Sequence, residues 1–117
     1  MRHVTSRNIN RDSKPLTEPV LLILLSLAGE PRHGYSLMKD IEDLSNGRVR
    51  LSTGTLYGAL RRLLEDQRIE RFESDDTSRD KQTYRLTLAG RRQLHIELKR
   101  LEQLTRAAKS RIKAMEV

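Results

Sequence analysis

The sequence predicts a small, mainly α-helical protein with one β-hairpin and a long C-terminal helix. Apolar residues recur at helical spacing in four segments of the 117-residue chain, which indicates amphipathic or buried helices. Two short segments with alternating side chains flank the polar stretch SDDTSRDK, and this pattern is typical of a hairpin with an exposed tip. The last segment carries an apolar heptad repeat that is longer than one small domain can cover.

Size and composition exclude several classes of protein. A chain of 117 residues is expected to form one domain, which buries a modest core but not the elaborated cleft that most enzymes need. Cysteine is absent, so neither a disulfide framework nor a thiolate metal site can form. The longest apolar run, residues 20–25, or 20–28 if Ser26 is allowed, is far shorter than the roughly 20 residues that span a bilayer. We therefore expect a cytoplasmic protein that is not an enzyme and has no cofactor, metal site or membrane span.

Positive charge is concentrated at the two ends of the chain. The net charge is +7, from 23 basic and 16 acidic residues, and a basic small protein is expected to bind a polyanion. Residues 1–15 carry +3 and residues 88–117 carry +5, whereas residues 16–87 carry −1. Within this central part, residues 48–71 hold six arginines against three acids. A nucleic-acid-binding face must therefore come from local segregation of charge in the folded domain.

Capping residues and apolar periodicity predict the first two helices. Thr17 is a suitable N-cap for a helix that contains VLLILLSLAG and stops at Gly29, a residue type favoured directly after a helix end. Because this helix is apolar on nearly every face, it should lie at the centre of the fold. The second helix starts at His33, which is expected to bond locally, and its apolar stripe includes Tyr35 as a core residue. Asn46 and the glycine after it should end this helix.

A third helix and a hairpin follow. RVRL, residues 48–51, could be a strand or an extended link, and Ser52 is a plausible N-cap for a helix that runs to about Gln67. RIERFES and QTYRLT then read as two short strands on either side of a polar loop. The tyrosine and leucine of the second strand share one face and are expected in the core.

The last helix is predicted to join two copies of the chain. Thr87 can cap this helix, which covers residues 88–117 and is too long to pack on a small domain along its whole length. Its heptad seam therefore needs a partner, most simply a second copy of itself. The residues of this dimerisation seam are Leu94, Leu98, Leu101, Leu104, Thr105, Ala108, Ile112 and Met115.

The order helix, helix, helix, hairpin, helix is that of a winged helix-turn-helix fold. It divides the chain into three regions. Residues 1–15 form a flexible basic arm, residues 16–87 form the winged helix-turn-helix domain, which is expected to bind DNA, and residues 88–117 form the dimerisation helix.

The third helix carries two glycines, four residues apart, on the face away from the predicted core. Each glycine costs up to about 1 kcal/mol relative to alanine, but together they leave a smooth surface that another backbone can approach. The same face ends in two arginines that can reach phosphates or base edges, and the helix N-terminus suits a phosphate. The alternative is a surface helix whose glycines pack against a neighbouring helix. The candidate DNA-binding residues here are Ser52, Thr53, Gly54, Thr55, Tyr57, Gly58, Arg61 and Arg62.

Three segments together resemble one known family. HGYSLMKDI (33–41), GTLYGALRRLLED (54–66) and YRLTLAGRRQL (84–94) stand in the order and spacing of PadR-family transcriptional regulators, of the short type with a single C-terminal dimerisation helix. The resemblance covers about residues 16–110. It implies a homodimeric repressor whose third helix enters the major groove of an inverted-repeat operator.

The resemblance also implies contacts that residue patterns alone do not predict. The wing would bring Arg79 and Lys81 to the DNA, and a small-molecule effector would bind near the dimer interface. Many relatives have proline where this chain has Gly58, and a glycine followed by an apolar residue where it has Gln67 and Arg68. The turn from the third helix to the first strand should therefore differ here.

Two other functions are compatible with the sequence. Because the central domain carries −1, a winged helix that binds a protein partner is one alternative. Nucleic-acid binding that ignores sequence, driven by the basic arm and the basic last helix, is the other.

Overall fold

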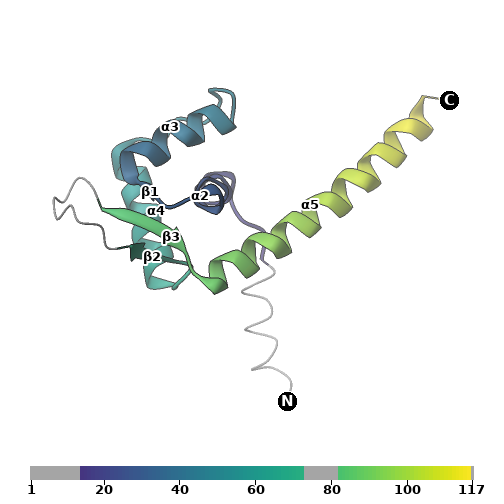
Figure 1. The fold of residues 1–117 in the computed structure, drawn as a ribbon. Coiled ribbons are helices and arrows are strands. Elements are labelled where there is room, and N and C mark those ends of the chain that lie inside the picture. The colour runs from purple at the N-terminus through teal and green to yellow at the C-terminus, as the bar shows by residue number, and fades with distance from the viewer. Residues whose placement is uncertain (1–13, 73–81, 117) are drawn as a thin grey trace, which may run out of the picture.

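In the described part of the chain, three helices and a small sheet pack together, and a fourth, longer helix projects from them (Figure 1). The structure, a computed structural model, describes residues 14–72 and 82–116. In chain order its elements are α2 (Glu18–Gly29), β1 (Arg32–His33), α3 (Gly34–Leu44), α4 (Thr53–Glu65), β2 (Ile69–Phe72), β3 (Thr83–Leu86) and α5 (Leu88–Met115). Helices α2, α3 and α4 and the small sheet form the body, and α5 extends far beyond it (Figure 1). The predicted fold, a winged helix-turn-helix with a long C-terminal helix, is confirmed.

Helix α2 lies at the centre of the body, as its apolar sequence predicts. Ile23 and Leu24 are fully buried, while Leu25 stays 40% exposed on one side. Thr17 occupies the N-cap position, although its side chain makes no capping hydrogen bond. Gly29 is the last residue of the helix and has no left-handed backbone. Its predicted role is therefore wrong, because the chain leaves α2 through an extended residue that requires no glycine.

Helices α3 and α4 close the core around α2. Leu37 and Ile41 of α3 and Leu56 and Leu60 of α4 are buried completely or almost so. Each such side chain contributes about 1.5–3 kcal/mol relative to its exposed state. Four buried leucine and isoleucine side chains from two helices thus hold α3 and α4 at a defined angle.

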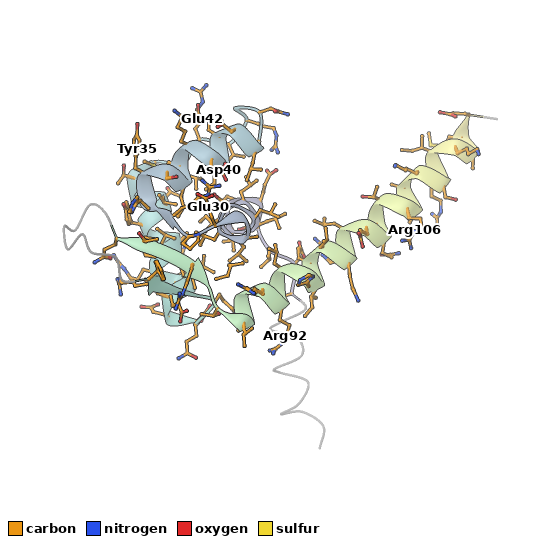
Figure 2. All side chains as sticks on the ribbon, viewed as in Figure 1. Glu30, Tyr35, Asp40, Glu42, Arg92 and Arg106 are labelled. Carbon is orange, nitrogen blue, oxygen red and sulfur yellow. The ribbon has the colours of Figure 1, made fainter. Side chains whose placement is uncertain are left out.

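The ends of α3 show one correct and one wrong prediction. Asn46 and Gly47 adopt left-handed backbone angles, with φ of 55° and 79°, and end the helix as expected. Tyr35, however, is 74% exposed and points away from the body (Figure 2). The prediction of a core tyrosine is wrong because two residues along a helix correspond to about 200° of rotation. Tyr35 therefore faces away from the buried Leu37.

The wing is part of a three-stranded antiparallel sheet with strand order β1-β3-β2. The predicted hairpin is confirmed, with Ile69 opposite Leu86. Strand β1 was not expected, because two residues are too few to show a period of two. His33 of β1 also bonds across the sheet, with its Nδ1 3.1 Å from the hydroxyl oxygen of Thr83, so the expected local bond is wrong. RVRL, residues 48–51, forms a link that begins with a bend and contains no strand.

The junction between β3 and α5 is tightly packed. Thr87 caps α5, because its hydroxyl accepts the N–H of Gly90 at 3.1 Å. The hydroxyl of Thr87 also donates to the carbonyl of Gln67 at 2.6 Å. A Cβ at Gly90 would lie 2.0 Å from the carbonyl oxygen of Arg68. Only glycine fits here, and the close approach fixes the direction in which α5 leaves the body.

The turn between α4 and β2 contains a residue with left-handed backbone, and its predicted difference from the turn of many relatives stays a prediction. Gln67 has a φ of 59°, a left-handed value that glycine adopts more easily. The third helix ends at Glu65, two residues earlier than predicted.

Helix α5 is 28 residues long, or about 42 Å at 1.5 Å per residue. Beyond Leu101 its large apolar side chains are exposed, with Leu104 48%, Ile112 55% and Met115 80% exposed. Arg106 lies on this projecting part (Figure 2). Among the described residues, no helix is both long and apolar enough to cross a bilayer.

Candidate nucleic-acid interface

The outward face of α4 is exposed because its other face is buried in the core. The hydroxyl of Ser52 accepts the N–H of Thr55 at 3.1 Å, so the predicted N-cap of this helix is confirmed. Ser52, Thr53 and Thr55 are all exposed around this end of the helix. The hydroxyl of Ser52 donates to that of Thr55 at 3.0 Å. The hydroxyls of Thr53 and Thr55 and the free N–H groups of the first turn can therefore donate hydrogen bonds to an anion.

The two glycines of α4 face open space. A Cβ at Gly54 or at Gly58 would meet no atom within 4 Å. No neighbouring helix within the described residues therefore packs against them, which contradicts the alternative that they serve packing inside the chain. They leave the outward face of α4 flat and accessible to another molecule.

The two arginines that follow the glycines are exposed cations. Arg61 and Arg62 form no ion pair with another residue in the described part of the chain. Other arginines nearby are paired: Arg48 bonds to Glu18 through two nitrogens, and Nε of Arg50 lies 3.6 Å from a carboxylate oxygen of Glu42. The bond from Arg48 lowers the pKa of Glu18. Arg61 and Arg62 therefore give the outward face of α4 a positive charge that no described residue neutralises.

Tyr57 connects α4 to the start of α3. A Cβ at Gly34 would lie 2.3 Å from the phenol oxygen of Tyr57 and 2.8 Å from its Cζ. The glycine of the HGY segment and the tyrosine of the GTLY segment are therefore a packing pair. Tyr57 remains 38% exposed, so its ring both supports the angle between the two helices and borders the outward face.

A groove of about 510 Å³ runs between α4 and the sheet. It contains a residue that the sequence analysis missed, Arg71, on the same side as Arg61. Nε of Arg71 donates to Oε1 of Gln82 at 2.9 Å. The signal for Arg71 was present: a period of two puts it on the same strand face as the buried Ile69. The residues that line this groove are Thr53, Tyr57, Leu60, Arg61, Leu64, Arg71, Gln82 and Tyr84.

Two predicted regions of contact lie outside the described residues. Arg79 and Lys81 of the wing belong to the segment 73–81, and most of the basic arm belongs to the segment 1–13. Their predicted contacts with DNA remain predictions.

The seam of α5 divides into two parts. Leu94 packs against the core of its own chain. Leu98 and Leu101 line an apolar groove of about 420 Å³ together with Leu21 and Leu25 of α2. The remaining seam residues, Leu104, Thr105, Ala108, Ile112 and Met115, are exposed. Helix α5 thus carries more apolar surface than its own domain covers.

The described residues contain no group of three or more His, Cys, Asp or Glu side chains that could hold a metal ion. The outward face of α4 offers hydrogen-bond donors and positive charge.

Comparisons with known proteins agree with this architecture. Residues 22–96 match the model of the "Transcriptional regulator PadR-like family". A transcriptional regulator from Clostridium thermocellum has a similar structure, with 20% identity, a TM-score of 0.65, and coverage of 88% of this chain and 96% of that one. A PadR family transcription regulator from Clostridium difficile has 23% identity and a TM-score of 0.66, over 80% of this chain and 96% of that one. A PadR-like transcription factor from Bacteroides fragilis has 21% identity and a TM-score of 0.66, over 91% and 97% of the two chains.

One curated relative is an uncharacterized 37.1 kDa protein in a transposon of Streptomyces fradiae. It is 38% identical over 85 residues, which are 73% of this chain. This chain matches only 23% of the length of that relative.

Proposed function

The chain belongs to the PadR-like family of transcriptional regulators, and from this premise we propose that it is a sequence-specific, dimeric DNA-binding repressor of the cytoplasm. The observation that supports this function best is the outward face of α4. On this face, no described atom lies within 4 Å of a Cβ at Gly54 or Gly58. Arg61 and Arg62 lie further along the same face and are exposed. A helix face of this kind is flat and cationic, which suits close contact with the edge and backbone of a duplex.

Helix α4 would enter the major groove with its N-terminus first. At this end, the capped first turn and the hydroxyls of Thr53 and Thr55 would bond to phosphates. Gly54 and Gly58 would let the helix lie close to the DNA. Arg61, one turn further along, would reach a base edge or a neighbouring phosphate.

The exposed seam of α5 supports a homodimer. Leu98 and Leu104 are 49% and 48% exposed, and Ile112 is 55% exposed. Side chains of this size are stabilised when a second copy of the helix covers them. A two-fold dimer would place its two α4 helices about 34 Å apart, so the operator should be an inverted repeat.

The dimer is tested by sedimentation equilibrium of two variants. Ile112→Glu puts a charge on the seam and should convert the dimer to monomer. Ser110→Glu adds the same charge on the opposite face of α5 and should leave the dimer intact. Equal behaviour of the two variants would contradict pairing through this seam.

A small-molecule effector would bind in the apolar groove between α2 and α5. Leu21, Leu25, Leu98 and Leu101 line it, and it adjoins the exposed seam. Because these lining side chains are aliphatic, an aliphatic ligand would fit better than a planar aromatic ligand held by stacking. Release of the operator duplex by such a ligand, and retention by a Leu25→Glu variant, would test this binding site.

The regulator function is tested by fluorescence anisotropy. The duplex is the DNA upstream of the gene for this chain, compared with a scrambled duplex over a series of salt concentrations. Clear preference for the upstream duplex near physiological salt is the expected result. Equal affinity for both, lost as salt rises, would indicate counterion release alone. No binding to either duplex would favour a protein partner.

A further inference from the structure

The groove between α4 and β2, called here the α4–β2 groove, contains two arginines and no carboxylate among its lining residues. Arg61 comes from α4 and Arg71 from β2. Its other polar lining groups are the hydroxyls of Thr53 and Tyr57 and the amide of Gln82, apart from the buried Tyr84. A concave surface with two cations and only neutral polar groups has a positive potential and attracts an anion.

Strand register explains why Arg71 faces this groove. Ile69 lies opposite Leu86 and Arg71 lies opposite Tyr84, so all four side chains are on the same face of the sheet. Ile69, Leu86 and Tyr84 are buried under α4 and α2, but Arg71 is exposed. The core ends between the two β2 residues, and the arginine therefore lies at its edge beside α4.

The guanidinium of Arg71 is held in place by two side chains that line the same groove, Gln82 and Tyr84. Its Nε donates to Oε1 of Gln82 at 2.9 Å. The side chain of Arg71 also forms a hydrogen bond with the phenol of Tyr84. Arginine has five N–H donors in a fixed plane, so two such partners still leave donors for a ligand in the groove. Burial raises the pKa of the neighbouring Tyr84 phenol, which stays neutral at physiological pH. Gln82 thus orients Arg71 as a donor toward the groove.

Arg85 on the other face of the same hairpin has a different environment. Its Nε donates to a carboxylate oxygen of Glu70 at 2.8 Å, and its guanidinium lies 4.7 Å from the centre of the Phe72 ring. This arginine is neutralised and stacked. It is therefore a matched control for Arg71: it has the same charge, is one strand away and faces the opposite side.

We propose that the α4–β2 groove binds a phosphodiester of the DNA backbone, with Arg71 as the phosphate-contacting residue. The proposal rests on the regulator function proposed above. When α4 lies in the major groove and the hairpin lies over the adjacent minor groove, the strand that separates the two grooves passes between α4 and β2. A phosphate of that strand meets Arg71, Arg61 and the hydroxyl of Tyr57. This contact sets the register of the domain on DNA and carries no sequence information.

The test compares Arg71→Gln with Arg85→Gln in anisotropy titrations of the upstream and scrambled duplexes. Arg71→Gln should weaken binding to both duplexes by the same factor, about tenfold near physiological salt. It should also lower the magnitude of the slope of log K against log salt by about 0.9, the value for one lost phosphate contact. Arg85→Gln should change neither quantity. Gln82→Ala keeps the charge, so it should weaken binding without changing the slope.

Several results would overturn the proposal. A slope change that is the same in Arg71→Gln and Arg85→Gln would reflect net charge and not a contact. Loss of binding to the upstream duplex alone would mean that Arg71 reads a base. Urea unfolding of Arg71→Gln should match the wild type, which separates a lost contact from a lost fold. If the wild type itself shows no preference for the upstream duplex, the regulator function fails, while the slope comparison on the scrambled duplex still tests the groove.

Discussion

Replacement of Gly58 by alanine tests whether the open face of α4 makes close contact with DNA. Gly58 lies in the middle of α4, and a Cβ there would meet nothing within 4 Å. The substitution removes no contact and adds no clash. Because glycine loses more backbone entropy than alanine in a helix, the variant should be more stable by about 0.8–1 kcal/mol.

The same substitution at Gly90 should have the opposite effect. A Cβ at this position would lie 2.0 Å from the carbonyl oxygen of Arg68, which is main chain and cannot rotate away. Overpacking of this kind costs about 1–3 kcal/mol or more. The pair of variants therefore separates the helix propensity of alanine from the space available around each glycine.

Urea unfolding, followed by the helical circular dichroism signal at one protein concentration, measures both effects. With an m-value of about 2 kcal/mol/M, Gly58→Ala should raise the midpoint by about 0.4–0.5 M with m unchanged. Binding to the upstream duplex should weaken at the same time, because a methyl group would stand between α4 and the DNA. A lower midpoint would refute the structural reasoning. A higher midpoint with unchanged DNA affinity would refute the close approach.

Three further predictions concern the cap of α4, the contact between α3 and α4, and a buried carboxylate of α5. Ser52→Ala removes the cap of α4 and should cost about 1 kcal/mol of stability in the same urea assay. Gly34→Ala should displace the Tyr57 ring and lower stability, and a double-mutant cycle with Tyr57→Leu should show that the two losses are not additive. Arg100 holds the pKa of the buried Glu97 below its usual value of 4.5. The stability gained from ionised Glu97 is therefore present near neutral pH and lost as pH falls below 4.5, so the difference in urea midpoint between wild type and Glu97→Gln should shrink over that range.

Local chemistry was enough to predict the helices and the hairpin. Ser52 and Thr87 act as caps within three residues of their own position, and both were identified correctly. The break after α3 depends on Asn46 and the glycine after it, whose backbone preferences are properties of the residues themselves. Such features follow from the sequence because the interacting groups are neighbours along the chain.

Features that depend on distant partners were missed. His33 bonds to a hydroxyl 50 residues away, so no local pattern could identify its partner. Tyr35 is a different case: it was assigned to the core from its apolar character, although about 200° of helical rotation from the buried Leu37 puts it on the outer face of α3. Arg71 became a candidate only when strand register and the end of the core placed it beside α4.

The sequence by itself therefore determined which segments form the main helices and the hairpin. It also determined that the glycines and arginines of α4 share one face, and that α5 carries an apolar seam. These properties are periodic and local. Only the tertiary structure decided that nothing in the described chain covers the glycines, that Tyr57 rests on Gly34, and that Arg71 shares a groove with Arg61. The physical reason is that close packing joins side chains far apart in sequence, and their separation in space depends on how the helices and the sheet meet.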